Sequence, residues 1–424
     1  MGLYDHIATE DISFSDPEVF QRMEHHELFA RLRAEDPVHW TTEESGPGYW
    51  SITKLEDLQV INRDATGFSS EANGVNMIEP ADMDPTYDMR GKMMLMTDPP
   101  RHTRYRLLVN KGFTPRMIGL IEQHLQHRTE LIVDQVIESG ECDFVTQIAA
   151  ELPLQAIAEI MGVSQEQRHM LFDWSNRMVG ADDPEYATEN PDDATMAAAE
   201  LYMFASELGA KRREDPRDDI VTKLINAEIQ GDSLTQEEFE LFMLLLTVAG
   251  NETTRNATAH GMLALMENPG EFAKLCSDPD RYIEGAVEEI LRWATPVMHF
   301  RRTAMRDIEL RGKTIKAGDK VVMWHISANR DEDAFVDPMR FDIERSANDH
   351  IAFGGGGAHF CLGANLARVE LTLIFREIAK RLGTMELAGP PERLRSNFIG
   401  GIKHIPVKFT SGERLHPVPA GVSV

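Results

Sequence analysis

The chain has 424 residues, and its 70 acidic and 43 basic side chains give a formal net charge of −27 at pH 7. This charge excludes the usual kind of nucleic-acid partner, since no basic cluster is present to follow a phosphate backbone. No Pro/Ser-rich linker, repeat or low-complexity run divides the chain, which predicts a single domain over residues 1–424.

The cysteines and the apolar runs indicate the cellular compartment of the protein. Cys142, Cys276 and Cys361 are odd in number and form no metal-type CxxC pair, so we expect a reducing compartment and no disulfide framework. The first residues lack the apolar core of a signal peptide, and the longest apolar runs are shorter than a membrane span. The sequence therefore predicts a cytoplasmic protein with no membrane partner.

The N-terminal part mixes helical and extended patterns. Residues 27–33 have helical periodicity and residues 49–53 an extended pattern, which predicts a small sheet-bearing region. Residues 69–96 are loop-like and rich in Asn, Asp, Pro and Met. One interpretation is a mobile cover over an apolar pocket, and the other is a surface excursion with a few packed methionines. The adaptable lining of the pocket would be Met77, Ile78, Met93, Met94 and Met96.

A helix then begins after two prolines and places His102 and Arg106 one turn apart on one face. Taken alone, such a pair is either a solvated surface or a ligand site. Helical periodicity dominates after it, and an acidic, proline-containing break at residues 180–193 interrupts it. The expected helices span residues 118–140, 144–161, 165–179 and 194–213.

The longest predicted helix spans about residues 236–267. A capping box formed by Thr235 and Glu238 begins it, and Asn-Pro-Gly ends it. Its residues 242–248 are apolar on all sides, so this part should be buried.

Small and polar residues follow in the middle of that helix, as Ala-Gly-Asn-Glu-Thr-Thr at residues 249–254. Such a break in a local rule often marks function. We expect the Thr253 hydroxyl to bond back to the carbonyl of Ala249 and to loosen the turn. One interpretation is a groove where dioxygen lies beside an acid, Glu252, and an alcohol. The other is a tolerated kink with satisfied polar groups.

The next features are weaker. Glu289 and Arg292 have i,i+3 spacing on a helix expected at residues 283–293. An extended apolar piece follows at residues 296–300, in which we expect His299 to be a packed or hydrogen-bonded side chain, not a metal ligand. Further strands are expected around Ile308, Leu310, Ile315, Val321, Val322 and Trp324.

The remaining motif is Phe-Gly-Gly-Gly-Gly-Ala-His-Phe-Cys-Leu-Gly at residues 353–363, with helical periodicity directly after it. Glycines permit a tight turn and a flat approach to a bulky partner. A thiolate at Cys361 would gain from the helix dipole and from loop N–H groups, so we expect a lowered thiol pKa and a metal-binding sulfur. The alternative is an inert buried thiol.

This stretch resembles the haem-binding loop of the cytochrome P-450 monooxygenases, with matches at Phe353, Gly357, His359, Cys361 and Gly363. Phe353 lies eight positions before Cys361, one more than the commonest spacing. Some bacterial members that act on terpenoids, branched lipids and sterols are similar in this respect. The resemblance implies a mainly helical, triangular P-450 fold with small β-sheets. It also implies haem b with Cys361 as the axial thiolate, which favours O–O cleavage.

Other motifs resemble the same family in the same order along nearly the full chain. The resemblance implies a lid at residues 180–193, a proton relay by Glu252 and Thr253 in the oxygen-activation segment, and Arg302, or Arg301 after a slip of one residue, as a propionate ligand. The implied cofactor contacts are His102, Arg106, Ala249, Arg302, Phe353, His359 and Cys361. The implied substrate contacts are Met94, Met96, Leu246, Val297, Met298, Phe398 and Ile399. The implied structural network behind the haem is Glu289, Arg292 and Arg345.

The predicted reaction inserts one oxygen atom from O2 into a C–H bond of a terpenoid, branched lipid or sterol side chain. The resemblance implies electrons from NAD(P)H through a ferredoxin and a ferredoxin reductase. No flavin or iron–sulfur motif occurs in the chain, so this electron donor must be a separate protein. Hydroxylation of a linear fatty acid or alkane is an alternative, as is a non-oxidative haem-thiolate sensor or isomerase. A non-haem binding protein would be recognised by the absence of haem absorption.

Overall fold

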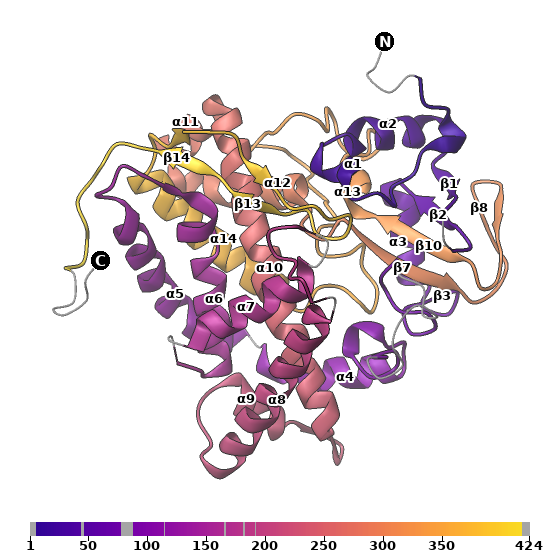
Figure 1. Cartoon of the computed structure of the whole chain (residues 1–424), viewed down its shortest axis with the longest axis horizontal. Helices are drawn as coiled ribbons and strands as arrows, with labels where there is room; N and C mark the ends of the chain where they lie inside the picture. The colour runs from indigo at the N-terminus through magenta and orange to yellow at the C-terminus, as the bar shows by residue number, and fades with distance from the viewer. Residues whose placement is uncertain are drawn as a thin grey trace.

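A computed structural model describes residues 6–43, 46–77, 88–113, 115–164, 167–180, 183–190 and 192–417. The fold is mainly α, with 51% helix against 12% strand, as the sequence predicted. Figure 1 shows most helices packed together on one side, and the largest sheet with the N-terminal helices on the other. Among the described residues, no helix has both the length and the apolar character that crossing a membrane requires.

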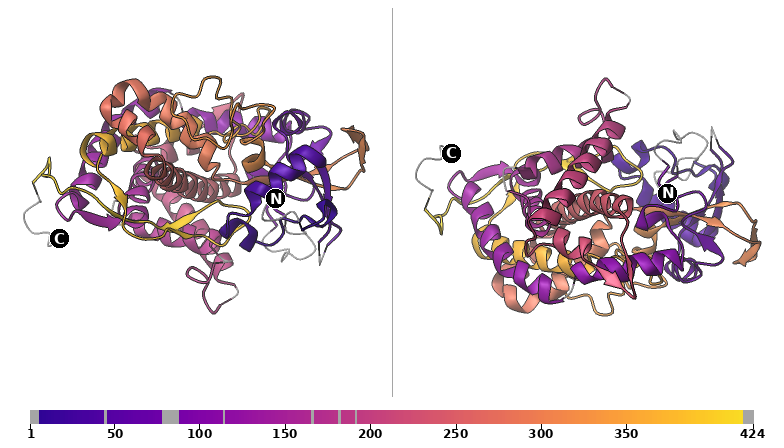
Figure 2. Two further views of the ribbon diagram at one scale, coloured as in Figure 1. Left: turned by 90° about the horizontal axis from the view of Figure 1, so that it is seen from above. Right: turned by 90° about the horizontal axis from the view of Figure 1, so that it is seen from below.

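Helix α10 (Gln236–Glu267) is the centre of the helical part and is seen nearly end-on in Figure 2. The predicted bounds and capping box are confirmed, because Thr235 and Glu238 exchange both side-chain hydrogen bonds at its start. Within residues 242–248, where burial was predicted, five residues are buried, whereas Leu245 and Val248 are half-buried.

Eight of the other helices in the described residues share a core with α10, and α6, α8, α12 and α14 are among those in direct contact with it. Their apolar faces form one large core cluster with α10. The predicted helix at residues 144–161 begins with a π-helical turn, Val145–Ala149. The helices in question are α4 (Arg101–Val109), α5 (Pro115–Val136), α6 (Glu151–Met161), α7 (Arg168–Val179), α8 (Asp193–Glu214), α9 (Ile220–Ile225), α12 (Pro279–Ala294) and α14 (Ala364–Arg381). Shorter elements are α11 (Pro269–Ser277), α13 (His325–Ala328) and the 3-10 turns Thr9–Asp11, η4 (Met94–Met96) and Asn110–Gly112.

The largest sheet has five strands in the order β1-β2-β10-β7-β3. Only the pairing of β2 with β10 is parallel. The strands are β1 (Val38–Thr41), β2 (Tyr49–Ile52), β3 (Phe68–Ser69), β7 (His299–Ala304) and β10 (Lys320–Trp324). Side chains of this sheet form one hydrophobic cluster with α1 (Glu18–Gln21) and α2 (His25–Glu35). Other side chains of the same sheet form a second hydrophobic cluster with α3 (Leu55–Arg63).

Four small sheets complete the strands of the described residues, and two of them contain strands of the C-terminal part of the chain. A three-stranded sheet has the order β11-β14-β4, and three two-stranded pairs are β12–β13, β5–β6 and β8–β9. Their strands are β4 (Glu141–Asp143), β5 (Glu228–Ile229), β6 (Asp232–Ser233), β8 (Ile308–Leu310), β9 (Lys313–Ile315), β11 (Glu386–Leu387), β12 (Glu392–Arg393), β13 (Ile402–His404) and β14 (Pro406–Lys408).

Two predicted features lie partly outside the described residues. Ile78 of the methionine-rich loop is one such position, and residues 181, 182 and 191 of the acidic break are others. Asp183, which is described, anchors that break, since its carboxylate accepts the N–H of Arg395 at 2.8 Å and pairs with Lys403 at 3.0 Å.

Candidate functional site

The loop before α14 turns on three glycines with positive φ, Gly354, Gly356 and Gly357. A Cβ at Gly357 would lie 2.1 Å from the carbonyl oxygen of Asn62 on α3. Glycine is therefore required here both for its conformation and for close backbone approach. The sequence analysis expected the glycines to allow a flat approach to a bulky partner. At Gly357 the partner is the backbone of α3.

Cys361 ends this loop, and the residue as a whole keeps accessible surface although protein atoms surround its sulfur. Its N–H donates to the carbonyl of Phe353 at 2.9 Å, which closes the loop on itself. The Phe353 ring lies under the guanidinium of Arg368 at 4.6 Å, and Arg368 in turn pairs with Glu288 at 2.6 Å. The sequence analysis missed Arg368, although it lies two turns after Cys361 on the helix that the motif begins.

The predicted lowering of the thiol pKa is wrong for this structure. Burial raises the pKa of the Cys361 thiol, because protein atoms around the sulfur displace the water that would solvate a thiolate. The N–H groups of Gly363 and Ala364 and the nearby guanidinium groups of Arg106 and Arg368 act in the opposite direction but are outweighed. The helix end and these cations thus favour an anionic sulfur without being sufficient to offset its burial.

His102 and Arg106 meet the cysteine loop at one atom. His102 Nε2 lies 2.9 Å from the carbonyl oxygen of Ala358, to which Arg106 Nη1 donates at 3.2 Å. The His102 ring also contacts the His359 ring, with 3.9 Å between centroids, and His359 Nε2 lies 3.2 Å from the Ser70 hydroxyl. The predicted pair therefore shares its helix face and reaches the loop that carries Cys361.

Arg302 belongs to the same group of basic side chains. Arg302 is only 5% exposed and forms no ion pair among the described residues. Its Nη1 instead donates a hydrogen bond to the carbonyl of Arg301 at 2.8 Å. Burial lowers the pKa of Arg302 to about 10, against the influence of Asp98. Burial together with Arg302, His102 and Arg106 lowers the pKa of His359 to about 2, so His359 is a neutral hydrogen-bonding group here and not a cation.

These residues satisfy what a haem group requires of a protein. Cys361 offers a sulfur ligand, and Arg106 and Arg302 bring guanidinium donors to the surroundings of that loop. A buried guanidinium without a carboxylate partner is costly, and a haem propionate would supply the missing anion at Arg302. The side chains present therefore fit haem b.

The middle of α10 keeps an accessible strip in an otherwise buried helix. Leu245 and Thr253 are half-buried and Ala249 between them is exposed, at the i, i+4, i+8 spacing of one helix face. Thr253 Oγ1 donates to the Ala249 carbonyl at 2.7 Å, as expected. The helix nevertheless continues without a break. Gly250 instead allows α10 and α6 to pack closely, because a Cβ there would lie 2.5 Å from the Ile157 side chain of α6.

Glu252 is held inside the protein by a polar cluster. It is 1% exposed, its Oε1 accepts from Ser175 at 3.0 Å and Asn251 at 3.2 Å, and its Oε2 pairs with Arg255. The sequence analysis missed both main partners. The i,i+3 spacing of Glu252 and Arg255 was a readable signal, whereas Ser175 comes from α7 and had none.

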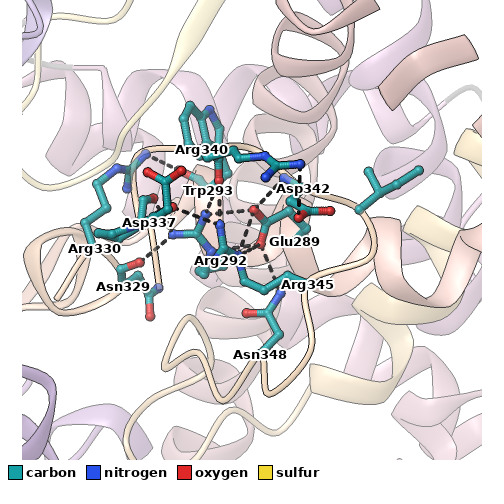
Figure 3. Close-up of polar contacts among 12 residues, drawn as sticks. Glu289, Arg292, Trp293, Asn329, Arg330, Asp337, Arg340, Asp342, Arg345 and Asn348 are labelled. Atoms are coloured by element: carbon teal, nitrogen blue, oxygen red, sulfur yellow. Dashed lines mark hydrogen bonds and ion pairs between the residues drawn. The ribbon is translucent and has the colours of Figure 1, made fainter. Parts of the chain in front are cut away.

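Glu289, Arg292 and Arg345 form a single network, shown in Figure 3. Arg292 reaches the Glu289 carboxylate with two nitrogens at 2.8 Å, and Arg345 Nε approaches it at 3.0 Å. Both arginines also donate to main-chain carbonyls of the segment before the cysteine loop. These carbonyls belong to Pro338 for Arg292, to Val336 and Asp337 for Arg345, and to Arg340 for both.

The expected substrate contacts divide into two sets. Met96, Val297 and Phe398 keep accessible surface. The other four are less than 9% exposed, namely Met94, Leu246, Met298 and Ile399.

Met298, one of the expected substrate contacts, belongs to the N-terminal core cluster. It packs in the N-terminal core with Phe20 and Trp324, and it lines a cavity of about 110 Å³ on that side. Successive side chains of an extended segment point to opposite faces, so Val297 and Met298 cannot both line one pocket.

His299 is packed, as the sequence predicted. Its Nδ1 lies 3.0 Å from the carbonyl oxygen of Asn397, and burial lowers its pKa to about 4. Its ring contacts Phe398 at 5.4 Å between centroids, and Phe300 contacts Phe398 at 5.9 Å. The strand β7 and the turn at residues 397–399 thus present aromatic rings together.

Comparison with known proteins gives a consistent result. Residues 70–382 match the family described as Cytochrome P450. The chain is 45% identical over 417 residues to a steroid C26-monooxygenase of Rhodococcus jostii, covering 96% of this chain and 87% of that protein. It is 41% identical over 391 residues to a methyl-branched lipid omega-hydroxylase of Mycobacterium bovis, covering 90% of each.

A solved structure is also similar. The Mycobacterium marinum cytochrome P450 CYP268A2 in complex with pseudoionone superposes with a TM-score of 0.87 at 39% identity, covering 94% of this chain and 98% of that one. The chain belongs to the cytochrome P450 family. It is a haem-thiolate monooxygenase that uses O2 to hydroxylate an apolar small molecule.

Proposed function

We propose that this monooxygenase oxidises the terminal methyl group of a methyl-branched alkyl chain, such as a sterol side chain or a branched lipid. The observation that carries this proposal is the pair of relatives, whose names share this chemistry. C26 is a terminal methyl carbon of the steroid side chain, and omega denotes the last carbon of a lipid. A linear fatty acid remains the second candidate because it presents the same chain end without the branch.

Accessible apolar side chains support the proposal of a site for such a chain end. Leu245 and Ala249 of α10, Met96 of η4, Val297 and Phe398 all keep accessible apolar surface. The turn η4 contacts α10 directly. In our proposal these side chains bind the alkyl chain through apolar contact and exclude water from it.

Haem b, bound through Cys361, supplies the redox chemistry that activates O2. Arg106, Arg302 and His102 hold its propionates, and His359 and Phe353 pack in the loop on the cysteine side. The Glu289–Arg292–Arg345 network fixes the segment that leads into this loop, so its contribution is structural.

Thr253 and Glu252 move protons in this proposal. The Thr253 hydroxyl, which donates to Ala249 in the present structure, turns toward the pocket to donate a proton there. Glu252 exchanges its contacts with Arg255 and Ser175 for water, takes up a proton from solvent through that water and passes it to the Thr253 oxygen. Electrons come from NAD(P)H through a separate ferredoxin and ferredoxin reductase, and we place the protein in the cytoplasm.

The test is an optical titration of the haem-loaded ferric protein with cholesterol, a methyl-branched fatty acid, a linear fatty acid of the same length and a monoterpenoid. We expect the branched compounds to shift the haem toward high spin, and turnover with a surrogate ferredoxin system to yield a terminal alcohol. A stronger shift and faster turnover with the linear acid would replace the proposed substrate by the second candidate. No product under O2 consumption would contradict both.

A further inference from the structure

Two helical residues and one residue of the C-terminal segment form a cluster remote in sequence from the haem site. His127 and Glu130 lie one turn apart on α5, and His416 follows β14. One ligand atom of each lies within 4.8 Å of the others. His416 Nε2 is 2.9 Å from Glu130 Oε2, and His127 Nδ1 is 3.9 Å from the same oxygen.

The main chain brings His416 to this place without help from its ring. The N–H groups of Leu415 and His416 donate to the two carboxylate oxygens of Asp134 at 2.9 and 2.8 Å. Arg381 of α14 pairs with the same carboxylate, and the N–H of Gly412 donates to Ile137 at 2.9 Å. The C-terminal segment therefore runs alongside α5 (Figure 1) with its backbone already fixed.

A hydrogen bond from Gln126 orients the Glu130 carboxylate of this cluster. Gln126 Nε2 donates to Oε1 at 3.1 Å, which leaves Oε2 directed at the two histidines. Such an outer contact orients a ligand and is typical of metal sites.

The donor set matches one kind of ion. Two imidazoles and one carboxylate are the ligands of many zinc sites, with bonds of about 2.0–2.2 Å and tetrahedral geometry, which separates the ligand atoms by roughly 3.3 Å. The ligand atoms now lie within 4.8 Å of one another, so zinc binding in this proposal requires the side chains to rotate closer together. His127 is 56% exposed and His416 is 32% exposed, so an ion and a water as fourth ligand have access.

A simple ion pair between His416 and Glu130 explains only part of this arrangement. His127 is the third member, and it approaches the same Glu130 oxygen although its contact with His416 is a ring contact, with 4.8 Å between centroids. We propose that His127, Glu130 and His416 bind Zn²⁺ and thereby fasten the C-terminal segment to α5. This site is independent of the proposed function.

The test uses the haem-loaded protein after treatment with a chelator and its removal. Calorimetric titration with ZnCl2 is compared among the wild type, H127A, H416A and the control H124A. His124 lies one turn earlier on α5, is 73% exposed and contacts Glu159 instead. We expect one equivalent bound by the wild type and by H124A, with an affinity at least about tenfold weaker in H127A and H416A, since each removes one of three ligands.

A second measurement tests whether zinc fastens the C-terminal segment to α5. Trypsin cleavage after Arg414 releases the peptide that begins at Leu415, and its rate is followed by mass spectrometry with and without ZnCl2. Zinc should slow this cleavage at least about fivefold in the wild type and in H124A, but not in H127A, because a bound ion stabilises the closed segment. Equal zinc affinity in the wild type and H127A, or equal protection in both, would overturn the proposal.

Discussion

Arg292 donates from both Nε and Nη2 to the Glu289 carboxylate at 2.8 Å, and the side chains of this ion pair are completely buried. Such a pair stabilises a fold only while each charge remains matched, because desolvation of either one alone is expensive. Arg345 and Asn348 complete the carboxylate's contacts from the segment that precedes the cysteine loop.

The first prediction concerns this pair. Glu289→Ala leaves the Arg292 guanidinium buried without its anion, and we expect it to cost about 3–5 kcal/mol of stability and to weaken haem retention. Denaturant unfolding followed by circular dichroism and by haem absorbance measures both. Lys316→Ala, which removes an exposed pair with Asp307, is the control and should change neither measurement.

The second prediction separates the proton-donating alcohol from an ordinary helix threonine. Thr253→Ala should lower product formation on the order of a hundredfold while NAD(P)H consumption continues, the lower end of what proton transfer contributes to catalysis. Thr258→Ala is the matched control, since Thr258 Oγ1 makes the same back-bond to Thr254 at 2.9 Å further along α10. Product per NAD(P)H and peroxide release are measured for both. An equal loss of coupling in the two variants would show a structural effect on α10, not a proton role for Thr253.

The third prediction compares Phe398, an expected substrate contact with accessible surface, with Met298, which packs in the core. Phe398→Ala removes accessible aromatic surface and should weaken sterol binding about 10- to 100-fold, as expected for the loss of a Phe contact. Met298→Ala should instead lower the free energy of unfolding by about 2–5 kcal/mol as a core truncation, with little change in the sterol dissociation constant. Optical titration and denaturant unfolding distinguish these results, and the reverse pattern would restore Met298 as a substrate contact.

The fourth prediction is a pH dependence of stability. His404 on β13 pairs with Asp143 and Glu185, and although burial opposes it, these carboxylates raise the pKa of His404 above its ordinary value. A raised pKa in the folded state means that the stabilisation is complete below the unfolded pKa of about 6.5 and is lost as the pH rises through the folded value.

His404→Gln should therefore destabilise the protein at pH 5.5 and have much less effect at pH 9. Thermal unfolding of the wild type and the variant across this range measures the difference. A destabilisation that is equal at both pH values would assign the role of His404 to packing.

Much of the fold was already determined by local sequence signals. The bounds of α10 follow from Thr235, Glu238 and the Asn-Pro-Gly stop, because capping and helix termination depend on residues close together in the chain. The conformation of the loop follows in the same way from the run of glycines before Cys361, since a backbone with positive φ that packs directly on another backbone accepts little else.

Only the tertiary structure decided which neighbours each of these residues meets. Burial around Cys361 raises its thiol pKa against the helix-end effect that the sequence suggested, because desolvation depends on the whole surrounding fold. Ser175 reaches Glu252 from another helix, and Met298 turns away from the pocket toward Trp324. The periodicity of a sequence specifies the faces of an element, whereas the packing of elements distant in the chain determines what each face contacts.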